Sequence, residues 1–423
     1  MKHRHDQNLL SAIALFVLLV SCSPGPQAGG GIGGTGHIAS VASGPITGFG
    51  SIFVSGTEYE TTHTTMMIDG KPGSQSDLQK GMIVRVGATL REQSGTNDQP
   101  VRMANAVLYE DTLEGFIQSV ATDGSHLVVL GQTVTITSAT SIDASIPGGN
   151  VLNLVPGRDL VEISGFVMGE GNIRGTLIRL KTFSATTSTP DYQVKGFITH
   201  HTPAQHTFEI GALTVDYQDA VLTDLPGQSS SVWDGLLVDV VGAQLLSGGG
   251  QSPSLRLTAT RVRLEGLGSM DSEEVVIEGF VTRILSPGNF LFGNQQVVTN
   301  AGTVFEGGTG NDILVGVHLE VHGSLVGGVV KATKVEFEDA DLKGLVTQVL
   351  APGRFSIGTV QVLTSPATVF TGGTANDIVV GVHVEVYGSV VDGTVNATKV
   401  EFEQRAGLLA TGPSADTVNS TVP

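Results

Sequence analysis

The chain of 423 residues contains one cysteine, Cys22, so no disulfide bond can form within it and no cysteine-based metal site can be built. Aromatic residues make up only 5%, which leaves few rings on which bases or sugars could stack. Basic residues are also few, because 22 Lys and Arg stand against 40 Asp and Glu, a formal charge of −18. A chain this acidic is a poor partner for nucleic acid, so we expect none.

Glycine is abundant instead, with 57 residues, and 16 prolines accompany it. Apolar residues make up 40% of the chain and charged residues only 15%. The bulk of the chain is therefore not a disordered acidic tail. This composition predicts a folded protein with many tight turns between short strands.

The N-terminus has the order of a secretory signal. Lys2 and Arg4 precede an apolar run from Leu9 to Val20, too short to span a bilayer comfortably. The run ends in LVSC, which resembles the lipobox of bacterial lipoproteins. That resemblance implies a signal peptide over residues 1–21 and lipidation of Cys22, and Ser23 favours outer-membrane sorting. An ordinary secretory signal with a chance cysteine is the alternative. No later apolar run reaches membrane-spanning length.

The rest of the chain repeats one unit. Residues 277–338 and 342–403 are nearly the same sequence twice, offset by 65 positions. Three more divergent units precede them, and each of the five has a glycine that opens an alternating strand: Gly81, Gly157, Gly235, Gly316 and Gly381. The expected organisation is a Gly-rich tether over 22–43, units over 44–112, 113–183, 192–266, 275–339 and 340–404, and a tail over 405–423, with linkers at 184–191 and 266–274.

The fourth unit has clear strand signals and no helical periodicity. Expected strands are Ile277–Leu285, Phe290–Phe292, Gln296–Thr299, Val317–Val321 and Val329–Glu338. Alternation places one set of side chains inside (Val317, Leu319, Val321, Val335 and Phe337) and another in solvent (His318, Glu320, His322, Lys334, Glu336 and Glu338). Five short strands in about 65 residues predict a small all-β barrel, because closure removes exposed edges.

The segment GPITGFGSIFVSGTEYETT and the recurring strand–turn–Gly–V-x-V units resemble the bacterial repeat family called domain of unknown function 5666. The resemblance covers Gly44 to Glu403 and is weakest in the second and third units. It implies tandem five-stranded OB-like β-barrels in a cell-envelope protein. It carries no established activity, so it assigns no catalytic residues.

One strand face in each of the last two units carries candidate metal ligands at alternate positions. His318-x-Glu320-x-His322 becomes His383-x-Glu385-x-Tyr387 in the fifth unit. Two histidines four residues apart on a straight strand are separated by roughly 13 Å, so one zinc ion cannot take both. We therefore favour a solvated face with pairs such as Glu320–Lys334, and keep His318, Glu320, His383 and Glu385 as surface candidates.

Other candidates have simpler explanations. The histidine-rich stretch 200–206 (HHTPAQH) is expected at a hairpin tip, with transient metal or proton binding as the alternative. Asp312 and Asp377 are expected to cap single helical turns, because one carboxylate is a poor calcium site. Trp233 is expected to pack in a core or at its rim.

No phosphate-binding loop and no G-x-S-x-G elbow occurs in the sequence. We therefore expect a non-catalytic protein without a cofactor, attached to the outer membrane through Cys22 and built as a rod of five barrels in a row. Its role would be structural or interactive, with an envelope protein or glycan as partner. The alternative is a ligand-binding protein for a glycan or divalent cation at grooves between barrels, and an enzyme is the third possibility.

Overall fold

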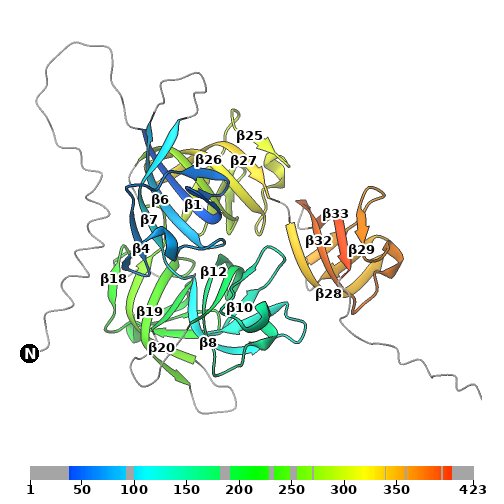
Figure 1. Ribbon diagram of the computed structural model, residues 1–423, viewed down its shortest axis with the longest axis horizontal. Coiled ribbons are helices and arrows are strands. Elements are labelled where there is room, and N and C mark those ends of the chain that lie inside the picture. The colour runs from blue at the N-terminus through cyan, green and yellow to red at the C-terminus, as the bar shows by residue number, and fades with distance from the viewer. Residues whose placement is uncertain are drawn as a thin grey trace, which may run out of the picture.

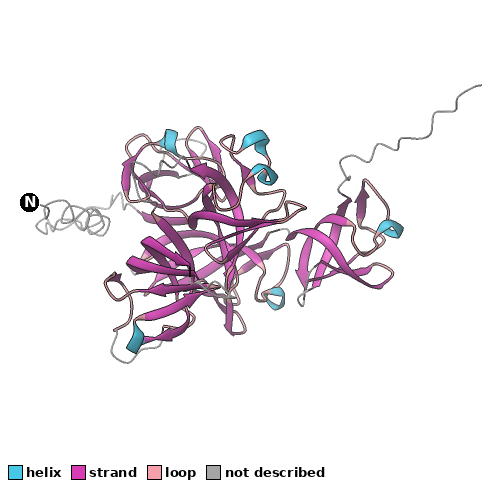
Figure 2. Ribbon diagram, turned by 90° about the horizontal axis from the view of Figure 1, so that it is seen from below, coloured by secondary structure: helices cyan, strands magenta, loops and turns pink. Residues whose placement is uncertain are grey.

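The computed structural model describes residues 38–91, 100–181, 191–227, 233–247, 255–268, 271–338, 340–357, 360–391 and 394–402. Within these residues the chain is almost entirely β-strand and forms five barrels (Figures 1 and 2). The signal peptide, Cys22 and the predicted tail over 405–423 lie outside the described residues.

The strands divide into five groups along the chain. Barrel 1 holds β1 (Ile38–Phe49), β2 (Ile52–Val54), β3 (Thr57–Tyr59), β4 (Thr65–Ile68), β5 (Lys71–Gly73), β6 (Ile83–Arg91) and β7 (Val101–Tyr109). Barrel 2 holds β8 (Leu113–Val120), β9 (His126–Val129), β10 (Gln132–Thr135), β11 (Ser141–Ile142), β12 (Leu160–Gly169) and β13 (Asn172–Lys181). Barrel 3 holds β14 (Tyr192–Phe197), β15 (Thr199–Thr202), β16 (Thr207–Ile210), β17 (Leu213–Asp216), β18 (Val221–Thr223), β19 (Leu237–Ser247) and β20 (Leu255–Leu264).

The last two barrels follow the same plan. Barrel 4 holds β21 (Ser272–Phe280), β22 (Arg283–Ser286), β23 (Asn289–Phe292), β24 (Gln295–Val298), β25 (Val304–Glu306), β26 (His318–Val326) and β27 (Val329–Phe337). Barrel 5 holds β28 (Ala340–Ala351), β29 (Arg354–Ile357), β30 (Val360–Leu363), β31 (Val369–Thr371), β32 (His383–Val391) and β33 (Thr394–Phe402). The helices in the described residues are single 3₁₀ turns: η1 (Gln75–Asp77), η2 (Pro147–Gly149), η3 (Val151–Asn153), η4 (Pro203–Gln205), η5 (Gly310–Asp312) and η6 (Ala375–Asp377). None of them is long and apolar enough to cross a membrane.

Each barrel closes in the strand order of an OB fold. In barrel 5, β28 pairs with β29, β29 with β30, β30 runs parallel to β33, β33 pairs with β32, and β32 returns to β28. Barrel 2 repeats this ring with β8, β9, β10, β13 and β12. In barrels 3 and 4 the first strand is split into two pieces that pair on opposite sides. The predicted all-β, OB-like architecture is confirmed.

The recurring glycine has one structural role in all five barrels. It adopts a positive φ, from 73° to 89°, in the turn that leads into the fourth strand of the ring. Its N–H donates to a carbonyl of the first strand at 2.7–2.9 Å, as from Gly81 to Ile46 and from Gly381 to Val346. Glycine is favoured because side chains rarely adopt this backbone conformation. The same backbone hydrogen bond, called the glycine clasp below, therefore joins the first and fourth strands in all five barrels.

Aliphatic side chains fill the barrels as the alternation predicts. In barrel 4 the side chains of Val317, Leu319, Val321 and Val335 are buried. Barrel 5 has its own core around Phe355, whereas barrels 2 and 3 share one continuous core. Trp233 is fully buried in that shared core and stacks on His201, with ring centroids 4.3 Å apart.

The barrels do not follow one another as a rod. Barrel 1 joins barrel 4 because β1 runs parallel to β21, from Ser40 beside Glu274 to Ser43 beside Ile277. Barrel 2 joins barrel 3 through a short antiparallel contact of β8 with β14. Two continuous sheets of 14 and 13 strands result, and barrel 5 forms a separate sheet of 6 strands. Figure 1 shows the four barrels clustered with barrel 5 to one side, which corrects the expected row.

Two strand boundaries and one side-chain pair also differ from expectation. β1 begins at Ile38, inside the predicted tether, because its first half pairs with β6 as well as β21. β21 begins at Ser272, inside the predicted 266–274 linker. The expected Glu320–Lys334 pair does not form, because the register places Glu320 opposite Glu336 and His322 opposite Lys334.

Candidate functional site

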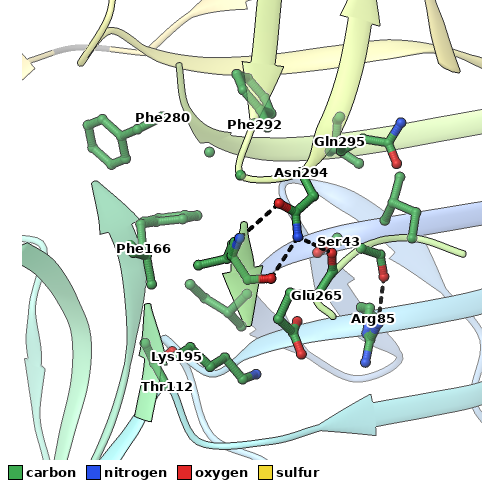
Figure 3. Close-up of a pocket in the computed structure, with 18 of the residues that line it drawn as sticks. Ser43, Arg85, Thr112, Phe166, Lys195, Glu265, Phe280, Phe292, Asn294 and Gln295 are labelled. Atoms are coloured by element: carbon green, nitrogen blue, oxygen red, sulfur yellow. Dashed lines mark hydrogen bonds between the residues drawn. The ribbon is translucent and has the colours of Figure 1, made fainter. Parts of the chain in front are cut away.

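A cavity of about 180 Å³ lies where the four clustered barrels meet (Figure 3). Its lining comes from strand ends and turns of all four barrels, which lie far apart in the sequence. Ser43 and Arg85 come from barrel 1, Phe166 from barrel 2, and Lys195 and Glu265 from the barrel 3 region. Barrel 4 contributes one wall, formed by Phe280, Phe292, Asn294 and Gln295.

Asn294 fixes barrel 4 against barrel 3 at this cavity. It lies in the turn between β23 and β24, and its Oδ1 accepts a hydrogen bond from the Leu237 N–H at 2.9 Å. Its Nδ2 donates to the carbonyls of Leu237 and Glu265, both at 2.7 Å (Figure 3). One side chain thus satisfies three backbone groups of another barrel, which specifies how the two dock.

An aromatic cluster at the wall of the cavity joins barrel 2 to barrel 4. The ring of Phe280 stacks on His318, with centroids 4.4 Å apart, and Phe166 of barrel 2 meets both rings edge-on. Burial lowers the pKa of His318, although Glu278 opposes this with Oε1 3.2 Å from Nε2. The imidazole is therefore neutral near pH 7 and acts as a packing surface.

The opposite wall is a network of buried charges between barrels 1 and 3. Glu110 accepts a hydrogen bond from Arg263 and lies 3.5 Å from Arg85. Asp239 is 2.8 Å from Arg261 and 3.3 Å from Arg263, and Gln193 donates to its other oxygen at 2.7 Å. Three acids (Glu110, Asp239 and Glu265) thus face four bases (Arg85, Lys195, Arg261 and Arg263), so every buried carboxylate has a cationic neighbour.

Two carboxylates of this network, Glu110 and Glu265, stay ionised near neutral pH, whereas burial, followed by the charge of Glu110, raises the pKa of Asp239. Burial would raise the pKa of Glu265, but Lys195, Arg85 and Arg263 outweigh it and lower the pKa to about 2. For Glu110, Lys195 and Arg263 likewise outweigh burial, and its pKa lies below the ordinary value. A general acid or base needs a pKa near the working pH. Glu110 and Glu265 therefore stay ionised and act as ion-pair partners between barrels 1 and 3.

The cavity itself is small for a ligand site, because pockets for organic ligands usually enclose about 300–1,000 Å³. Its charged groups are bonded to one another and to backbone: Arg85 donates to the Gly266 carbonyl at 2.7 Å and Lys195 to the Glu110 carbonyl at 3.1 Å. These bonds join barrels 1 and 3 at the cavity.

The four surface candidates from the sequence are largely shielded from solvent. His318 and Glu320 each expose only 12% of their side chains. His383 lies 3.5 Å from Asp123 of barrel 2, and Glu385, which is buried, accepts a hydrogen bond from the Ser138 N–H at 3.2 Å. The expectation of a solvated face is wrong at His318, His383 and Glu385, because these side chains lie against barrel 2.

The remaining candidates have structural roles. His201 accepts a hydrogen bond from the Trp233 N–H at Nδ1, and its Nε2 lies 2.8 Å from the Tyr217 hydroxyl. Asp312 accepts from the Thr309 N–H at 2.9 Å, and Asp377 accepts from Thr374 in the same way. The predicted caps and the predicted packing role of Trp233 are confirmed. Cys22 lies outside the described residues.

The sequence did not identify the residues that join the barrels. Asn294 occupies a predicted hairpin turn, where asparagine is common for local reasons. Arg261, Arg263 and Glu265 lie in RVRLEG, an alternating pattern that indicates a solvated strand face. The run of charged residues at the end of β20 was the available sign of an inter-barrel contact, but it does not reveal which barrel covers that face.

Fold and site together define a multi-barrel protein of OB-like modules joined through buried polar contacts. The family model described as Domain of unknown function (DUF5666) matches residues 35–96, 114–179, 278–336 and 343–401, more than half of the chain. The protein therefore belongs to this family, and its matches are tandem. Barrel 3 lies outside the matched segments, yet it has the same strand order and the same glycine clasp from Gly235 to Ile198. No curated protein matches the chain.

Proposed function

We propose that this protein is a non-catalytic envelope protein, anchored through a lipid on Cys22, whose four clustered barrels present barrel 5 for association with a second copy of the chain. The proposal is supported by the inter-barrel site, where ion pairs and backbone hydrogen bonds use the polar groups that a catalytic site would need free. It is supported at the N-terminus by the LVSC motif at the end of a signal-like apolar run.

The observation that carries the proposal concerns the first strand of each barrel. In barrels 1 to 4 the first half of this strand pairs with the first strand of another barrel, β1 with β21 and β8 with β14. Among the described residues, β28 of barrel 5 is hydrogen-bonded only to β29 and β32 of its own barrel. An open strand edge is a ready template for pairing with another chain.

Side chains on β28 point to the same conclusion. Leu345 occupies the position that holds Phe116, Phe197 and Phe280 in barrels 2, 3 and 4. In those barrels this position lies two or three residues after the last inter-barrel pair of the first strand. Phe280 packs on Phe166 of barrel 2, and Phe197 is buried. Leu345 by contrast is 44% exposed, and Val349 and Leu350 on the same strand are 43% and 42% exposed.

We propose that β28 of a second copy pairs with this edge, because in both existing contacts the first strand of one repeat pairs with the first strand of another. A two-fold axis would make the β28–β28 contact antiparallel, as the β8–β14 contact is. A dimer of this kind would hold two lipid anchors, and multiple anchors give durable membrane attachment.

Sedimentation velocity tests the association on the full chain carrying Cys22→Ser, which prevents lipidation. We expect a dimer that Leu345→Glu converts to a monomer, because the carboxylate would be buried beside an apolar strand edge. Val304→Glu is the matched control, since Val304 is an aliphatic residue on barrel 4 that is 56% exposed. A parent chain that stays monomeric at about 100 μM, or equal effects of the two substitutions, would refute the dimer.

Metabolic labelling tests the anchor separately. Cells given an alkyne-tagged fatty acid should label the wild-type chain and not a Cys22→Ala variant. Equal labelling of the two chains would reject lipidation at Cys22 and leave the dimer test unaffected.

A further inference from the structure

Three carboxylates converge where barrel 1 meets barrel 2. Asp69 lies in the turn between β4 and β5, Asp111 in the segment that joins the barrels, and Glu162 on β12. One oxygen from each lies within 4.8 Å of the others. The Asp111 N–H donates to Asp69 at 3.1 Å, so the backbone itself holds the first two side chains together.

One oxygen of this group lacks a partner. Asp111 is fully buried, and its Oδ1 accepts a hydrogen bond from the Tyr109 hydroxyl at 2.5 Å. Its Oδ2 is buried without any hydrogen-bond partner among the described residues. A buried carboxylate oxygen of this kind is costly unless something positive occupies the space beside it.

Counting charges shows how much is missing. Two bases serve the group: Lys181 lies 2.7 Å from Glu162 and 2.8 Å from Glu114, and Arg179 lies 3.0 Å from Glu162 and 3.9 Å from Asp111. With Glu114 counted beside Asp69, Asp111 and Glu162, four carboxylates face two bases. Two negative charges are therefore uncompensated when all six groups are ionised. The three-acid group of Glu110, Asp239 and Glu265 has four bases around it, so it carries no such deficit.

We propose that Asp69, Asp111 and Glu162 bind one divalent cation, calcium in preference to magnesium, and that this ion joins barrel 1 to barrel 2. The charge of the ion offsets the two uncompensated charges, and carboxylate oxygens are the ligands that such ions prefer. Calcium accepts oxygens at about 2.3–2.6 Å in flexible geometry, so three oxygens within 4.8 Å of one another can share it, whereas magnesium demands near-ideal octahedral geometry. Each Glu162 oxygen retains a lone pair beyond those used by Arg179 and Lys181.

Calorimetric titration and thermal unfolding of the full chain with Cys22→Ser test the site, after EDTA treatment and at constant ionic strength. We expect one calcium ion per chain and a rise in Tm of several degrees, with a smaller rise for magnesium. Asp111→Asn keeps the shape but removes the charge beside the unpaired position, and should abolish both effects. Asp216→Asn, an acid of barrel 3 paired with Arg256, is the matched control and should leave them unchanged.

Two further measurements keep the test decisive if Asp111→Asn does not fold. Asp69→Asn should fold, because Asp69 has φ of 48° and asparagine accepts that conformation, and should weaken calcium binding at least tenfold. Terbium, which takes calcium sites, should show luminescence excited through Tyr109, and Tyr109→Phe should remove it. The proposal fails if calcium changes neither heat nor Tm, or if its effect persists in Asp69→Asn, since the ion would then act elsewhere.

Discussion

Gly323 in the fourth strand of barrel 4 gives the most direct test of how these barrels close. It lies at a bulge between β26 and β27, where the pairing register shifts after His322. A Cβ added at Gly323 would lie 2.1 Å from the Lys331 carbonyl oxygen and 2.8 Å from its carbon. Both are backbone atoms, so no side chain can rotate away, and we expect Gly323→Ala to cost about 3 kcal/mol, the upper end for overpacking.

Gly316 in the same barrel supplies the matched comparison. Its φ is 87°, but a Cβ there would meet no atom within 4 Å. Gly316→Ala therefore carries only the conformational cost of an L residue at positive φ, partly offset by a stiffer unfolded chain, or about 1 kcal/mol. Gly316→Asn should cost less still, because asparagine tolerates that region better than alanine.

Hydrogen exchange measured by mass spectrometry separates the two effects. Amides of β26 and β27 should exchange about 100-fold faster in Gly323→Ala and about 5-fold faster in Gly316→Ala, since about 1.4 kcal/mol is a factor of ten. Amides of β32 and β33 in barrel 5 serve as the internal reference and should be unchanged. Equal acceleration in the two variants, or none in Gly323→Ala, would show that the close strand approach is not what requires glycine there.

Two other predictions concern the junction of the four barrels. The pKa of Glu265 is about 2 in the folded chain and 4.5 ordinarily, so ionised Glu265 should add about 3 kcal/mol to the free energy of unfolding. This contribution should be complete above pH 4.5 and lost as the pH falls toward 2. Urea unfolding from pH 7 to 2.5 should show the difference in unfolding free energy between wild type and Glu265→Gln shrinking, and a constant difference would contradict this. Asn294→Ala removes three hydrogen bonds between barrels 3 and 4 and should lower the unfolding free energy by about 3 kcal/mol, with Asn294→Asp at least as harmful because it cannot donate; a loss under about 0.5 kcal/mol would mean that barrel docking does not depend on Asn294.

The interior of each barrel could be predicted from the sequence because it depends on local patterns. Alternation placed Val317, Leu319 and Val321 in the core, and the 65-residue period predicted equivalent barrels at 4 and 5. The recurrent glycines marked the turn before each fourth strand. Each of these signals is produced by neighbours in sequence, or by copying of a unit, and needs no knowledge of other barrels.

The assembly of the barrels could not be predicted in the same way. A strand face with Arg261 and Arg263 has the same alternation whether water or barrel 1 covers it. His318 and His383 were expected in solvent for this reason, yet both lie against barrel 2. Charges buried in pairs between distant segments leave no periodic trace, so the inter-barrel site and the arrangement of the five modules required the structure.

The parallel contact of β1 with β21 sets an order of events during synthesis. Ser40 leaves the ribosome long before Glu274, so barrel 1 must fold or wait with one edge open while barrels 2 and 3 are made and joined. Contacts between such distant residues form slowly because a long loop must close first. The union of barrels 1 and 4 is therefore the expected late step of folding, and a chain interrupted before residue 274 would carry an unpaired strand edge prone to aggregation.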